Sequence, residues 1–115
     1  MSPDLVLPWL AAFVVTQLVE GPIYALWMRR DFSVLDALLR SSVLQLTTHP
    51  LLWLVFFDLM DAVGGYALAV VVAETCVVAL EGALLAWMWP AASWRRAFAA
   101  ALTANAVSTV VGLLR

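Results

Sequence analysis

The sequence of 115 residues contains no lysine, one histidine and one cysteine, and only 12% of its residues are charged. An ordinary soluble domain carries about 25% charged residues. A single core formed by a chain of this length could not bury the 65% of residues that are hydrophobic. The composition therefore excludes a soluble enzyme, a nucleic-acid-binding protein and a disordered chain. The single cysteine, Cys76, excludes an internal disulfide.

Motifs that would identify an enzyme or a cofactor site are also missing. The sequence has no serine nucleophile elbow, Cys-x-x-Cys pair, phosphate-binding glycine loop or haem-attachment motif. It also lacks the His-Glu-x-x-His and Glu-x-x-His spacings of zinc hydrolases and di-iron bundles. We predict no bound cofactor. A divalent metal such as Mn, Fe or Zn would have to use Glu20, His49, Glu74 and Glu81, which suit it by ligand type alone.

Four long apolar stretches occupy nearly the whole chain, at about residues 5–28, 35–57, 62–89 and 97–114. Each is close to the roughly 20 residues that a helix needs to cross about 30 Å of hydrocarbon. The sequence therefore predicts an all-α polytopic membrane protein, with four transmembrane helices in a bundle and a single transmembrane domain over residues 1–115. The first stretch is too long for a signal-peptide core and lacks a basic start.

Polar residues mark the ends of the second stretch. Ser33, with Asp36 three residues later, resembles a capping box that would begin a helix at the membrane surface. Arg40 could then extend back toward the lipid headgroups. Asp58 and Asp61 are expected to flank the turn that leads into the third stretch.

Basic and aromatic residues predict the orientation. Arg29-Arg30 and Arg95-Arg96 lie in the first and third connections, so the positive-inside rule makes both connections cytoplasmic and both termini outward, as in a bacterial-type plasma membrane. An aromatic belt of interfacial anchors is expected at the same boundary, formed by Trp27, Trp87, Trp89 and Trp94.

Polar side chains also lie deep within the stretches. Counted from the ends of the stretches, His49, Glu74 and Asn105 fall near the midplane of the membrane, and Glu20 and Glu81 lie about one turn closer to the cytoplasmic side. Glu74 and Glu81 are seven residues apart, which places them on one face of a helix, about 10 Å apart along its axis. A common polar layer through the bundle is the simplest arrangement.

A charged side chain at bilayer depth costs about 2.5–3.5 kcal/mol on insertion scales, so the three glutamates should point away from lipid. Burial and a second carboxylate nearby both favour the neutral form, so we expect at least one of them to hold a proton near neutral pH. The candidate ligand- or proton-binding residues are Glu20, Glu81, Glu74, His49, Gln17, Asn105 and Thr48. Alternatively, these side chains only hydrogen-bond helix to helix.

Two further patterns concern packing and local structure. Pro50 follows His49, and because a proline leaves one helix carbonyl without its donor, we expect a local break there of the kind that lines a cavity. The fourth stretch carries small residues every fourth position, which predicts close helix packing. This helix-packing ridge consists of Ala100, Ala104, Ser108 and Gly112.

A weak internal repeat relates the two halves of the chain. Residues 20–25 and 81–86 both begin with Glu-Gly, an offset of 61, and the same offset places residues 47–48 on 108–109. The first and third helices would run in the same direction, so the halves would be two parallel-repeat helical hairpins with Glu20 equivalent to Glu81.

Three functions remain open. The first is a small cation- or proton-coupled transporter or channel, a homo-oligomer in the lipid bilayer, in which Glu20, Glu74 and Glu81 bind a cation or exchange protons. The second is an accessory or assembly subunit of a larger membrane complex, whose polar residues fix contacts between helices. The third is a membrane enzyme acting on lipid or quinone, although the missing motifs favour a protein that is not an enzyme.

The arginine pairs give a first testable prediction. Reporter fusions at residues 30 and 95 should both report a cytoplasmic position, and a fusion near residue 61 should report an external one, because short basic loops are retained on the cytoplasmic side. A cytoplasmic reading near residue 61 would contradict this orientation.

Overall fold

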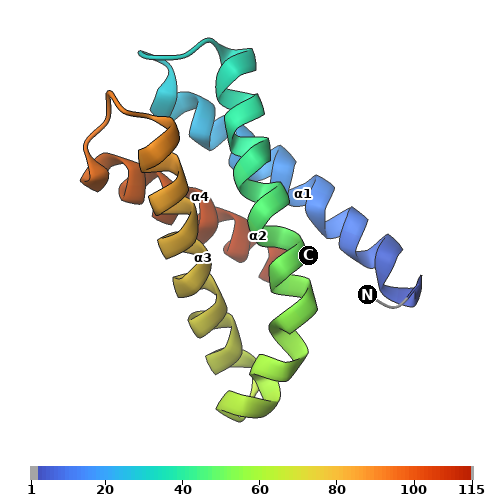
Figure 1. The fold of residues 1–115 in the computed structure, drawn as a ribbon. Coiled ribbons are helices and arrows are strands. Elements are labelled where there is room, and N and C mark those ends of the chain that lie inside the picture. The colour runs from blue at the N-terminus through green and yellow to red at the C-terminus, as the bar shows by residue number, and fades with distance from the viewer. Residues whose placement is uncertain (1–2, 115) are drawn as a thin grey trace.

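The computed structural model describes residues 3–114, which form four helices and no strand (Figure 1). The helices are α1 (Pro3–Met28), α2 (Val34–Val63), α3 (Tyr66–Met88) and α4 (Trp94–Leu114). Each of these helices is long and apolar enough to cross a membrane. The predicted all-α architecture of four transmembrane helices is therefore confirmed.

The helices form a ring in which neighbours in sequence are neighbours in space. α1 contacts α2 and α4, and α3 contacts α2 and α4. The connections α1–α2 and α3–α4, which precede or contain the arginine pairs, lie at one end of the molecule, here called the arginine end (Figure 1). The Gly64-Gly65 turn lies at the other, the turn end. α1 and α3 both run toward the arginine end, so the hairpins α1–α2 and α3–α4 are parallel to each other.

α2 is longer than the sequence predicts. The predicted end at residue 57 is wrong, because the helix continues through Asp58 and Asp61 to Val63, and both carboxylates are exposed on its last turns. The helix ends at Gly64, whose backbone is left-handed (φ 86°) and whose N–H donates to the carbonyl of Met60 at 3.0 Å. A residue with a Cβ adopts this conformation only at a cost, so glycine and not charge terminates the helix.

The expected break at His49-Pro50 is also wrong. α2 continues through Pro50 without interruption. The turns before the proline keep their helical geometry. The hydroxyl of Thr47 donates to the carbonyl of Val43, and that of Thr48 lies 3.1 Å from the carbonyl of Leu44. A proline removes only one backbone hydrogen bond, and a transmembrane helix packed against its neighbours tolerates that loss.

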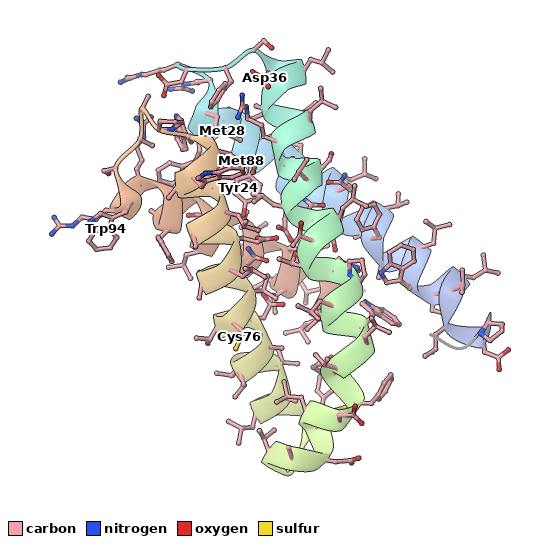
Figure 2. All side chains as sticks on the ribbon, in the orientation of Figure 1. Tyr24, Met28, Asp36, Cys76, Met88 and Trp94 are labelled. Carbon is pink, nitrogen blue, oxygen red and sulfur yellow. The ribbon has the colours of Figure 1, made fainter. Side chains whose placement is uncertain are left out.

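The core is concentrated toward the arginine end. Tyr24, Met28, Leu85 and Trp89 are fully buried there, and the labelled Tyr24 and Met28 lie in that half of the bundle (Figure 2). Trp89 is therefore no interfacial anchor, contrary to expectation. Its indole N–H instead donates to Asp31 at 2.7 Å, which closes the end of α3 against the α1–α2 connection. The side chains of Trp87 and Trp94 are 79% and 64% exposed.

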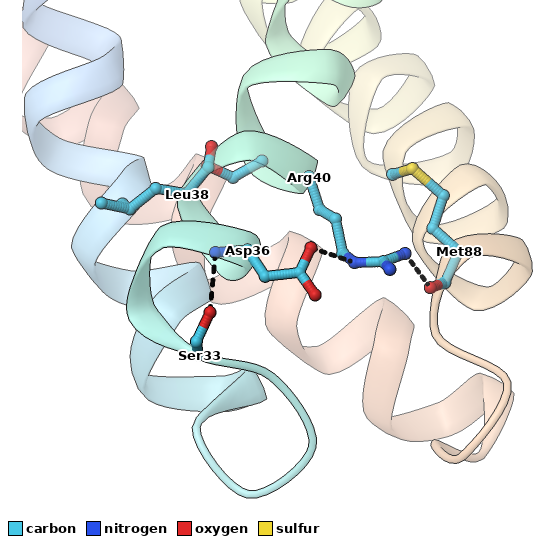
Figure 3. A network of polar contacts seen from close by, with 6 residues as sticks. Ser33, Asp36, Leu38, Arg40 and Met88 are labelled. Atoms are coloured by element: carbon cyan, nitrogen blue, oxygen red, sulfur yellow. Dashed lines mark hydrogen bonds and ion pairs between the residues drawn. The ribbon is translucent and has the colours of Figure 1, made fainter.

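Arg40 ties the start of α2 to the end of α3 (Figure 3). The predicted cap is present, since the Asp36 N–H donates to the Ser33 hydroxyl at 3.1 Å and α2 begins at Val34. The Asp36 carboxylate pairs with Arg40 at 3.0 Å, and the guanidinium also donates to the carbonyl of Met88 at 2.7 Å. Arg40 thereby satisfies one of the carbonyls that a helix end leaves without an internal partner.

Small residues permit close packing only in the half of the bundle near the arginine end. Ala100 and Ala104 of the predicted ridge are fully buried, but Ser108 is half-buried, and no atom lies within 4 Å of a Cβ built on Gly112. Gly82 of α3 instead makes room for a side chain of α4, because a Cβ built on it would lie 2.5 Å from the ring of Phe98. The predicted ridge is buried only over its first half, at Ala100 and Ala104.

The buried positions of the two hairpins repeat. The buried residues of α1 each have a buried counterpart 61 positions later, in the pairs Ala12/Ala73, Glu20/Glu81, Gly21/Gly82, Tyr24/Leu85 and Met28/Trp89. Between α2 and α4 the offset is 60, in the pairs Ala37/Ala97, Ser41/Ala101, Leu44/Ala104 and Gln45/Asn105. The offset therefore falls by one residue between the first and second helices of the hairpins. At the offset of 60, Thr48 corresponds to Ser108, so the predicted alignment of residues 47–48 with 108–109 is wrong by one residue.

Glycine 82 provides a test of this packing. Gly82→Ala should lower the free energy of unfolding in detergent by about 1–3 kcal/mol, because the added methyl group forces the ring of Phe98 to move. Gly112→Ala is the matched control and should leave the thermal midpoint unchanged or raise it, because the site is open and alanine favours a helix. Equal midpoints for both variants would contradict the close approach.

Candidate functional site

Glu81 is the centre of a hydrogen-bond network that joins all four helices. Its side chain is buried, with 1% exposure. Tyr24 of α1 donates to Glu81 Oε2 at 2.9 Å, and the amide of Asn105 of α4 donates to the same oxygen. Thr48 of α2 donates to Oε1 at 3.0 Å. Three donors around one carboxyl are an arrangement suited to holding a negative charge inside the bundle.

Glu20 occupies the equivalent position in α1 but has fewer partners. It is 2% exposed and interacts with the hydroxyl of Ser108, while its Oε1 atom has no hydrogen-bond partner. Gln45, which lies close to it in the same interior, is 1% exposed, and neither its amide nitrogen nor its oxygen is hydrogen-bonded. Buried polar atoms without partners are uncommon in proteins, because each costs about 1–3 kcal/mol.

The internal repeat explains this difference between the two carboxyls. The three donors to Glu81 are Tyr24, Asn105 and Thr48, and their counterparts around Glu20 are Leu85, Gln45 and Ser108. Leucine replaces the tyrosine, so one donor is lost, and the glutamine makes no bond to the carboxyl. The two halves thus build the same site twice, with full hydrogen bonding in one copy only.

Glu20 and Glu81 face a small inner chamber of about 60 Å³. The chamber is large enough for a few water molecules or one small cation. Its polar lining consists of Thr16, Glu20, Gln45, Thr48, His49, Glu74, Glu81, Asn105 and Ser108. Three carboxyls in one enclosed space repel one another when ionised, and no arginine lines the chamber within residues 3–114.

A second cavity of about 460 Å³, here called the vestibule, adjoins the inner chamber. It is lined by residues from all four helices and extends from mid-depth to Met60 and Tyr66 beside the turn at Gly64. The two cavities share five lining residues, namely Thr16, His49, Leu52, Glu74 and Ser108. The polar interior is therefore connected toward the turn end, whereas the packed core lies between it and the arginine end.

His49 lies where the two cavities meet. Its Nε2 atom is 3.4 Å from the hydroxyl of Thr16, and its Nδ1 atom is buried without a partner. The imidazole ring packs among aromatic rings, with centroid distances of 5.6 Å to Phe13 and 6.4 Å to both Trp9 and Trp53. Glu74 of α3, which also lines both cavities, is half-buried and interacts with the hydroxyl of Thr109.

Most of the candidate residues meet in this interior, but Gln17 does not. Its amide donates to Ser42 at 2.9 Å between α1 and α2, away from both cavities. Tyr24 and Gln45 belong to the interior although the sequence analysis did not select either as a site residue. The offset of 60 between the second helices would have identified Gln45, because it aligns this residue with Asn105.

Within the described residues, no group of three or more His, Cys, Asp or Glu side chains is arranged to hold a metal ion.

Comparison with protein-family models, curated proteins and solved structures gives no match. A functional argument for this chain therefore rests on the chemistry of these side chains and of the two cavities.

The network predicts unequal effects of two tyrosine substitutions. Tyr24→Phe should destabilise the protein by about 1 kcal/mol, because it removes one of three donors to a buried carboxyl and leaves the packing of the ring intact. Tyr66→Phe is the matched control, since that side chain is 55% exposed at the turn end, and should change the stability little. Thermal unfolding of both variants in the same detergent is the measurement, and equal effects would contradict the network.

Proposed function

We propose that this protein is a small membrane transporter or channel in which protons or small monovalent cations occupy the inner chamber. The observation that carries the proposal is the pair Glu20 and Glu81, both at least 98% buried and facing one chamber whose lining includes unpartnered polar atoms. In a bacterial-type plasma membrane the positive-inside rule would place the arginine end in the cytoplasm, so the vestibule would face outward.

The energetics of burial favour exchange at this site. An ionised carboxyl is strongly disfavoured in a dry interior unless a proton, a cation or several donors compensate its charge. Glu81 has three donors, but Glu20 has one interaction and an unpartnered oxygen. A proton or a small cation shared within the chamber would compensate the remaining charge. The vestibule gives that ion a route to one side of the membrane.

The same observation separates this proposal from a purely structural role. Polar residues that serve only as contacts between helices hydrogen-bond to one another, as Gln17 and Ser42 do. Glu20 and Gln45 instead keep polar atoms without partners inside the chamber, at a cost in stability. Such a cost is typical of sites that are built to receive an occupant. Release toward the cytoplasm would require the core around Tyr24 and Met28 to open, so a transporter with alternating access is favoured over a permanently open channel.

The test is ion flux into liposomes that contain the purified protein. Under a pH or sodium gradient, the wild type should raise the flux above that of empty liposomes. Glu20→Gln and Glu81→Gln should reduce this flux by about tenfold or more, because glutamine keeps the shape and one acceptor oxygen but cannot exchange a proton or hold a charge. Asp61→Asn is the matched control, because Asp61 is an exposed carboxylate at the turn end that lines neither cavity.

Thermal unfolding of each variant shows whether the fold is retained, so a loss of flux can be assigned to the carboxyl. Flux that is equal in wild type and in both glutamine variants would contradict the proposal. Absence of flux in the wild type under both gradients would also contradict it and would favour an assembly subunit of a larger membrane complex.

A further inference from the structure

The vestibule changes in chemical character along its length. Toward the turn end its walls are aromatic, formed by Trp53, Phe56 and Phe57 of α2 and Tyr66 of α3. Phe56 stands nearly perpendicular to Tyr66, with 5.8 Å between ring centroids, so the two helices form a continuous aromatic wall. The inner part is polar and contains the carboxyl of Glu74 at the junction with the inner chamber. An occupant that fits both parts has one polar end and one apolar end.

The charged residues of the lining indicate which charge the polar end of the occupant would carry. Glu74 is the acidic residue of the vestibule wall, and Glu20 and Glu81 lie just beyond it. No arginine lines the vestibule within residues 3–114, and His49 is its one potentially basic side chain there. The faces of aromatic rings also attract cations, by about 0.5–2 kcal/mol for each contact. Both features favour a cation and disfavour an anion.

The size and the apolar walls select the kind of cation. A volume of about 460 Å³ lies in the range of about 300–1,000 Å³ that is typical of sites for small organic molecules. A hydrated metal ion would gain little from the aromatic part. A polar neutral solute would leave many of its hydrogen bonds unmade there.

We propose that the vestibule binds a monovalent organic cation with an aromatic or apolar body. The charged group lies beside Glu74 and the body lies among the rings of Trp53, Phe56 and Tyr66. This inference rests on the proposed function, because it names the substrate class that would enter the same pathway. The bound cation and the proton or small cation of the inner chamber would then compete for the same negative field, which is a means of coupling their movements.

The experiment compares two probe ions of the same shape and opposite charge, tetraphenylphosphonium and tetraphenylborate. Binding is measured by equilibrium dialysis against the full chain in nanodiscs of zwitterionic lipid, with empty nanodiscs subtracted. The wild type should bind the phosphonium saturably and show no saturable binding of the borate. Glu74→Gln should weaken phosphonium binding by about tenfold, and Phe56→Leu should weaken it several-fold. Asp61→Asn is the control and should bind as the wild type does.

Saturable binding of both ions with similar affinity would overturn the inference, because the site would then be only apolar. Unchanged phosphonium binding by a folded Glu74→Gln would overturn it as well. If that variant does not fold, binding of the two ions to the wild type still tests whether the vestibule prefers a cation. Charge-selective binding without any ion flux would support this inference and contradict the proposed transport. Ion flux without phosphonium binding would support the proposed transport and contradict this inference.

Discussion

The structure depends on the burial of one carboxyl group, that of Glu81, among donors from three other helices. Tyr24, Thr48 and Asn105 each come from a different helix, and each must be oriented toward the same two oxygen atoms. In a bilayer the apolar surfaces of helices gain little from leaving lipid, so such polar contacts and close packing of small residues determine how the helices meet. The network therefore fixes the rotation of every helix in the ring, and the positions of the other polar residues follow from it.

The two ends of the bundle differ because the side chains between the helices differ in size. Near the arginine end, Gly21, Gly82 and buried alanines allow the helices to approach, and Met28 and Trp89 fill the space that remains. Near the turn end, the helices face one another through large aromatic residues, and a cavity remains between them. The polar interior thus lies at the boundary between a closely packed half and a half that contains a cavity.

The two hairpins have the same plan but unequal chemistry. Glu20 and Glu81 are equivalent by position, and the residues around them correspond one to one. The replacement of a tyrosine donor by Leu85 leaves Glu20 with an unpartnered oxygen, so the interior holds one fully hydrogen-bonded carboxyl and one that is not. The difference between the two carboxyls thus arises from side-chain differences between two hairpins of the same architecture.

The sequence by itself determined the four membrane spans, the shared depth of Glu20 and Glu81, and the repeated Glu-Gly, because length, hydropathy and helical spacing depend on the chain alone. The tertiary structure decided which polar residues meet. Gln17 and Gln45 have the same side chain, yet Gln17 lies between α1 and α2 while Gln45 lies in the chamber. It also decided that α2 runs through Pro50 and that two cavities connect to the turn end. These features depend on the rotation and separation of packed helices, which are set by contacts between residues far apart in the sequence.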